Sequence, residues 1–165
     1  MDKIYDLNLD YRNTKNAIEQ RKTFLIKNKI GICDIVDSCK RDKIDASDLG
    51  MKNIELRDLI NILNEHPSIN TILFMGGNSK NGPEYLFRKH LNSNSIRLNI
   101  ISDKSPKIHQ FLLKDRNIKT ISLISPSNAA NRSIGSNNLY KELKSKKNSF
   151  STFDFRLLHY KNYFI

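Results

Sequence analysis

The sequence predicts an α/β fold, specifically a three-layer α/β/α sandwich with a mainly parallel central sheet. Short apolar segments alternate with longer amphipathic segments along the 165 residues, which is the pattern of strands joined by crossover helices. Residues 69–75 are almost continuously apolar, as expected for a strand covered on both faces. We expect one domain over residues 1–165, because the length is typical of one domain and no repeat or linker interrupts the chain.

The first half of the chain is predicted to contain two helices around a short strand. Residues 14–29 carry apolar side chains at a loose helical period among Glu, Gln and Lys, which favour helices. Residues 32–36 are apolar and rich in β-branched side chains, which predicts a short buried strand. A polar loop is expected at residues 45–50. Residues 53–65 have mostly helical apolar spacing, and Pro67 ends this predicted helix.

The second half is predicted to form the sheet and its remaining helices. The strand at residues 69–75 ends at Gly76 and Gly77, and the next helix is expected to begin at Pro83, which the first turn tolerates. Ligands gather at the carboxyl ends of parallel strands, so we expect function in the loops that follow strands. The other expected elements are strands at residues 96–101 and 118–124, helices at residues 83–91 and 138–147, and an aromatic-rich segment at residues 150–165 that covers the core.

The chain is strongly basic, with 28 Lys and Arg residues against 17 Asp and Glu residues and a formal net charge of +11. Such a surface attracts polyanions before any specific contact forms, which makes nucleic acid the expected partner. The alternative is that the lysines only form solvated faces.

The residue pattern argues against a metal site, a cofactor and a membrane segment. Cys33 and Cys39 lack further ligands nearby, and no histidine pair has the spacing that places two metal ligands on one helix face. No apolar run is long enough to span a bilayer, and the first residues have no leader pattern. We therefore expect a cytoplasmic protein with reduced cysteines and with no metal or cofactor.

Two loops carry candidate binding residues. Gly76 and Gly77 allow a ligand to approach the backbone closely, and the polar residues 78–81 could seat a base or a phosphate. Residues 125–132 offer hydroxyls and amides that can bond phosphate oxygens, and Arg132 adds a charge. Either loop could also be an ordinary turn. Neither has the glycine spacing of a Walker or dinucleotide-binding motif.

The second loop resembles a DNA-repair signature. Its sequence Ser125-Pro126-Ser127-Asn128-Ala129-Ala130-Asn131-Arg132 is similar to the second signature of the uracil-DNA glycosylase superfamily. Residues 72–77 resemble the strand ending Phe-Asn-Gly in the hypoxanthine-DNA glycosylase-like branch, and residues 31–41 resemble another segment of that branch. The residues of this segment that match are Asp34, Ser38, Cys39 and Arg41. The three segments stand in the family's order and cover most of residues 24–140.

The resemblance implies an enzyme that flips a deaminated base, uracil or hypoxanthine, out of DNA and hydrolyses its glycosidic bond. The implied DNA contacts are Ser125, Pro126, Ser127, Asn128, Asn131 and Arg132. The implied base pocket is formed by Met75, Gly76, Gly77 and Asn78. Ser125 falls where other branches place a catalytic His or Asn, and Asp34 is the other catalytic candidate, with a structural role bonded to loop amides as its alternative.

Two departures from the family keep other readings open. The first signature, a glycine-containing loop with a water-activating Asp or Asn, has no counterpart in residues 2–10, so no general base is named, and a shortened chain start is one explanation left open. Met75 replaces the asparagine that reads the base. The alternatives are a non-catalytic DNA-binding relative and a basic α/β protein that binds nucleotides or RNA. A missing first strand would leave a sheet edge open, which favours a homodimer.

Overall fold

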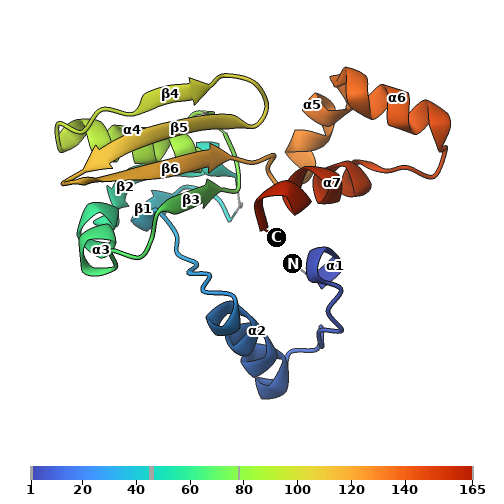
Figure 1. Ribbon diagram of the computed structural model, residues 1–165, viewed down its shortest axis with the longest axis horizontal. Helices are drawn as coiled ribbons and strands as arrows, with labels where there is room; N and C mark the ends of the chain where they lie inside the picture. Colours follow the sequence, from blue (N-terminus) through green and yellow to red (C-terminus); the bar gives the residue numbers. More distant parts are fainter. Residues whose placement is uncertain (1, 45–46, 78, 165) are drawn as a thin grey trace.

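The computed structural model describes residues 2–44, 47–77 and 79–164, and a four-stranded sheet lies at its centre (Figure 1). The order across this sheet is β3-β6-β5-β4. Its strands are β3 (Thr71–Phe74), β4 (Asn99–Ser102), β5 (Lys107–Leu113) and β6 (Arg116–Ser122). A separate two-stranded antiparallel sheet consists of β1 (Val36–Arg41) and β2 (Met51–Leu56). The fold is therefore mixed α/β, in agreement with the predicted class.

Helices surround the larger sheet unevenly. Figure 1 shows α3 and α4 beside the sheet and α2 apart from it. α5, α6 and α7 lie together at the end where β6 finishes. We call α5 to α7, residues 131–164, the C-terminal lobe. The helices are α1 (Asp2–Tyr5), α2 (Lys15–Lys27), α3 (Leu59–Glu65), α4 (Pro83–Ser93), α5 (Asn131–Ser136), α6 (Asn138–Lys146) and α7 (Thr152–Phe164), with short 3₁₀ turns η1 (Asp48–Gly50) and η2 (Asn128–Ala130).

The sheet is not mainly parallel, so that part of the prediction is wrong. β3 pairs with β6 in parallel, whereas β5 runs antiparallel to both β4 and β6. The cause is β5, which the sequence analysis missed. It joins β6 through a tight turn in which Lys114 has a φ of 53°. The three-layer sandwich is likewise not confirmed.

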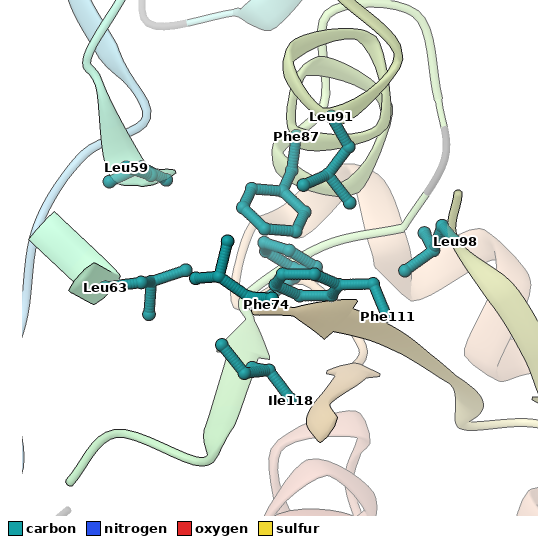
Figure 2. Close-up of a cluster of buried hydrophobic side chains, with 9 residues drawn as sticks. Leu59, Leu63, Phe74, Phe87, Leu91, Leu98, Phe111 and Ile118 are labelled. Carbon is teal, nitrogen blue, oxygen red and sulfur yellow. The ribbon is translucent and has the colours of Figure 1, made fainter. Parts of the chain in front are cut away.

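A cluster of large apolar side chains fixes α4 on one face of the sheet. Phe87 and Leu91 of α4 are fully buried, and Figure 2 shows them pointing toward Phe74 and Phe111 of the sheet. The ring centroids of Phe87 lie 5.1 Å from Phe74 and 5.6 Å from Phe111. Burial of each such side chain stabilises the fold by about 1.5–3 kcal/mol. This packing holds α4 next to the end of β3.

A smaller cluster covers the opposite face near the end of β6. Ile121 and Leu123 point to this face, because side chains of a strand alternate, and they pack with Ile4 of α1 and Tyr160 of α7. Tyr160 lies in the aromatic-rich segment that was predicted to cover the core. The C-terminal lobe is thus attached to the strand that leads into the second candidate loop.

Two predicted elements of the first half are wrong. Residues 31–34 have no regular structure and Ile32 is 75% exposed, so the buried strand predicted at residues 32–36 is absent and β1 begins only at Val36. The helix predicted at residues 53–65 begins at Leu59, because residues 51–56 form β2. Asp58 caps this shorter helix by accepting a hydrogen bond from the Asn61 amide at 3.1 Å.

The first predicted helix is confirmed as α2, whose side-chain cap is Thr14, an acceptor for the Ala17 amide at 3.1 Å. The helices predicted at residues 83–91 and 138–147 correspond to α4 and α6. In the part of the chain that the structure describes, no helix combines the length and apolarity needed to cross a membrane.

Candidate nucleic-acid interface

The two candidate loops meet at the carboxyl ends of β3 and β6. We call residues 75–82 the β3 loop and residues 123–130 the β6 loop. The parallel register pairs Phe74 with Ser122, so both loops leave the sheet at the same level. A Cβ atom added at Gly76 would lie 4.0 Å from the Cβ of Ser125. The structure therefore brings together the two segments that the sequence singled out.

Glycine geometry shapes the β3 loop. A Cβ atom at Gly82 would lie 2.7 Å from the carbonyl oxygen of Gly77 and 3.0 Å from that of Ser79, so only glycine fits there. Asn81 has a φ of 60°, and its amide donates hydrogen bonds to the carbonyls of Asp48 at 3.0 Å and Met51 at 3.3 Å. Asn81 thus ties the end of the loop to the smaller sheet.

A single arginine holds the β6 loop. Arg156 of α7 is 7% exposed, and its Nε donates to the Ser125 carbonyl at 2.9 Å. Its Nη2 donates to the Ser127 carbonyl at 2.9 Å and to Oδ1 of Asn131 at 2.7 Å. One turn further along α7, the Tyr160 hydroxyl donates to the Ile124 carbonyl. Three carbonyls of the loop are thus bound by α7, whereas residues 126–129 are exposed.

The outer side of the β6 loop is polar and uncharged. Ser125 is half-buried, whereas residues 126–129 are exposed. The Ser125 hydroxyl donates to the Ser127 hydroxyl at 3.0 Å, and the Ser127 amide donates to the Ser125 hydroxyl at 3.2 Å. This local turn presents hydroxyl and amide groups without a carboxylate, and such groups can donate hydrogen bonds to a phosphate oxygen.

Comparison with known proteins adds no identity to this geometry. No family model, curated protein or solved structure matches the chain. The case for the site therefore depends on its own contacts.

A buried carboxylate links the two elements that flank the loops, α4 and β6. Glu84, fully buried in the first turn of α4, accepts hydrogen bonds from the Ser122 hydroxyl at 2.7 Å and from Arg88 at 2.8 Å. The Nδ1 atom of His109 lies 3.8 Å from the same carboxylate. Burial lowers the pKa of His109, with Glu84 opposing this shift and Arg88 adding to it. Glu84 therefore ties the helix that follows the β3 loop to the strand that precedes the β6 loop.

The structure assigns different surroundings to the predicted site residues. In the predicted base pocket, Met75 is 39% exposed, Gly76 is buried and Gly77 is exposed. Asn78 lies outside the described residues. Two cavities of about 170 and 520 Å³ border α4, but neither is lined by the β6 loop, and only Asn81 of the β3 loop lines one of them. The base pocket stays a prediction.

The predicted DNA contacts and catalytic candidates do not all lie at the two loops, and they differ in exposure. Arg132 is exposed, whereas Oδ1 of Asn131 is occupied by Arg156. Asp34 is exposed, and its carbonyl accepts a hydrogen bond from Arg57 at 3.2 Å, but no described contact joins it to either loop. Within the described ranges, no group of three or more His, Cys, Asp and Glu side chains could hold a metal ion.

Sequence reasoning missed Arg156, Tyr160 and Glu84. Arg156 and Tyr160 stand four residues apart, which is the spacing of one helix face, but nothing in the sequence says that this face meets the β6 loop. Glu84 follows Pro83 in the first turn of a helix, where an exposed acid is common. Only its burial reveals its role.

Proposed function

We propose that this chain is a DNA-binding domain of the uracil-DNA glycosylase type that acts at deaminated bases, uracil or hypoxanthine, in duplex DNA. The observation that carries the proposal is the meeting of the β3 and β6 loops at Gly76 and Ser125. The β6 loop would clamp a phosphate through Ser127 and Asn128, and the β3 loop would approach the flipped base. Flipping costs a few kcal/mol, which backbone contacts offset.

The net charge supports a polyanionic partner. Phosphate neutralisation by Lys and Arg supplies most non-specific affinity, and neutral donors then fix the register on the backbone. Arg132, exposed directly after the β6 loop, is placed to add such a charge.

A second candidate is a non-catalytic relative that binds DNA without cutting it. One observation favours it. The β3 and β6 loops contain no Asp or Glu, and Asp34 makes no described contact with either loop. Hydrolysis needs a group that activates water, so the clamp alone would not provide it.

We call the proposed phosphate contact at Ser127 and Asn128 the clamp, and DNA binding is tested by placing a negative charge on it. Ser127→Asp should weaken binding of a labelled duplex about tenfold or more through repulsion of phosphate. Ser68→Asp makes the same charge change at an exposed site before β3 and should alter affinity by less than about twofold, as a distant charge is screened. Fluorescence anisotropy at several salt concentrations measures both, and equal effects of the two variants would refute the clamp.

Excision is tested on duplexes that contain uracil, hypoxanthine or xanthine. Glycosylase activity leaves an abasic site, so strands should break after alkali treatment. Salt-dependent binding with intact strands would support the non-catalytic candidate, and salt-independent binding would exclude both DNA proposals.

The remaining proposals concern context. Cys33 and Cys39 are free thiols, which fits a reducing compartment, so we propose a cytoplasmic protein. β3 forms one edge of the larger sheet, and a homodimer through an open edge remains a prediction. We also propose a three-layer α/β/α arrangement, in which α4 covers one face of the larger sheet and α7 the other, since each packs against one face.

A further inference from the structure

The charge of the chain is distributed unevenly. Residues 31–70, which include the smaller sheet, contain five Lys and Arg against eight Asp and Glu. Residues 125–165, which include most of the β6 loop and the whole C-terminal lobe, contain seven Lys and Arg against two Asp and Glu. The positive potential therefore lies away from the smaller sheet and includes the lobe beside the β6 loop.

Among the described residues, four exposed basic side chains of the lobe form no ion pair with a carboxylate. They are Arg132, Lys141, Lys144 and Lys147. Lys147 has an acidic neighbour in Asp154, because its charge helps to lower the pKa of that carboxyl. The one glutamate of α6, Glu142, is already paired with Lys146 at 2.5 Å. We call these four residues the basic surface.

The smaller sheet shows the opposite arrangement. Lys52 pairs with Asp42, and Arg57 pairs with Asp37 at 3.0 Å. Positive charge is neutralised there by neighbouring carboxylates, whereas on the basic surface it is available to an external anion.

Helix chemistry alone does not account for the basic surface. Lysines in the last turn of a helix interact favourably with its dipole, which applies to Lys144 and Lys146 of α6. Lys141 stands in the first half of α6, and Arg132 belongs to α5, so neither gains from that effect. Lys144 also donates to the Asn148 carbonyl at 2.5 Å, which holds its amine close to the end of α6.

The fold fixes α6 to the same turn of α7 that holds the β6 loop. The Tyr140 ring of α6 lies 5.7 Å from Phe155, edge to face, and 6.1 Å from Phe150. Phe155 immediately precedes Arg156, which binds the carbonyls of Ser125 and Ser127. Two neighbouring residues of α7 thus position α6 and the β6 loop relative to each other. Figure 1 shows α6 and α7 gathered at the end where β6 finishes.

We propose that the basic surface is a second phosphate-binding surface, whose partner is the backbone of duplex DNA flanking the base held at the clamp. Lys141 and Lys144 lie on α6 and Lys147 is its C-cap, so the three follow one another at intervals of three residues over about 9 Å of the helix axis. Duplex DNA carries one charge about every 1.7 Å of its axis, so this length faces several phosphates. The inference rests on the proposed DNA-binding function.

The test compares two triple variants of the full chain with equal net charge. One variant replaces Lys141, Lys144 and Lys147 by Gln. The control replaces Lys15, Lys22 and Lys27 by Gln on α2, which Figure 1 shows well away from the lobe. Glutamine preserves helix propensity, and all six side chains are exposed, so both variants should fold like the parent.

Affinity for a labelled duplex is measured between 50 and 200 mM salt, roughly the range in which counterion release dominates. We expect the α6 variant to bind about tenfold more weakly or worse. The slope of log K against log salt should become less steep by about 2 to 3. The α2 variant should keep the parent's slope.

The outcomes separate this inference from the proposed function. If the parent binds duplex with a steep salt dependence and the two variants behave alike, the basic surface is refuted and the clamp stands. If the parent itself does not bind duplex, both proposals fail. If the α6 variant loses affinity for a structured RNA and keeps that for duplex DNA, the assigned partner is wrong.

Discussion

The β3 loop and the β6 loop lie side by side, yet they are held by different means. Local geometry holds the β3 loop, since Gly82 leaves no room for a side chain and contacts residues only a few positions earlier. The β6 loop is held by Arg156, which lies 31 positions away from Ser125. The β3 loop is thus shaped mainly by glycines of its own sequence and linked through Asn81 to the smaller sheet, whereas the β6 loop depends on a distant helix.

The largest expected effect is at Arg156. Arg156→Leu leaves the carbonyls of Ser125 and Ser127 and the Asn131 side chain without their donor in a buried setting. We expect the free energy of unfolding to fall by about 3 kcal/mol and DNA binding to be lost with it. Urea denaturation measures the first, with exposed Arg132→Leu as a control that should change stability by about 0.5 kcal/mol or less. Equal destabilisation by both changes would show that Arg156 does not anchor the loop.

The next effect tests the local encoding of the β3 loop. Gly82→Ala places a Cβ atom 2.7 Å from the Gly77 carbonyl oxygen, so the backbone must shift. We expect a loss of about 2 kcal/mol in unfolding free energy. Gly77→Ala is the matched control, because nothing lies within 4 Å of its added Cβ. A tolerated Gly82→Ala would mean that the loop is not fixed by glycine geometry.

A smaller effect is expected at the link between the β3 loop and the smaller sheet. Asn81→Gly keeps the positive φ accessible and removes the hydrogen bonds to the carbonyls of Asp48 and Met51. Stability should fall by about 1 kcal/mol. Asn81→Ala removes the same bonds and adds backbone strain, so it should be the more damaging of the two. The reverse order in thermal unfolding would contradict this account.

The smallest expected effect is on the pH dependence of stability, through His109. Burial lowers the pKa of His109 in the folded state, so below the ordinary histidine pKa of 6.5 the unfolded chain takes up a proton more readily. The stability is therefore fully present above that pH and is lost as the pH falls. His109→Gln should flatten this dependence in denaturation curves between about pH 7 and 5. Burial lowers the pKa of His159 in the same direction, so part of the slope should remain.

The sequence predicted the elements whose signals are local. α2 and α4 followed from helical apolar spacing, with Thr14 and Pro83 marking their starts. β3 and β6 followed from apolar runs, and the neighbourhood of the two loops followed from placing these strands in parallel. Each helix and strand was predicted from its own residues, and the neighbourhood of the loops needed only the parallel arrangement of two of these strands.

The failures have physical causes. Ile54 and Leu56 stand two residues apart, which is a strand spacing, but their continuation into the apolar residues of α3 disguised β2 as a helix. His109, Phe111 and Leu113 alternate into the core as β5, yet a buried histidine weakened that pattern. The role of Arg156 could not be predicted at all, because it depends on where α7 packs.

The parallel pairing of β3 with β6 also has a consequence for the order of assembly. β4, β5 and β6 are neighbours in sequence, so their antiparallel contacts close short loops and should form early. β3 reaches β6 only across α4, β4 and β5, and a longer closure costs more chain entropy. The β3 loop and the β6 loop should thus come into contact only in the last step of sheet formation. A chain with its hairpins formed but β3 undocked would look largely folded to circular dichroism and would have no site.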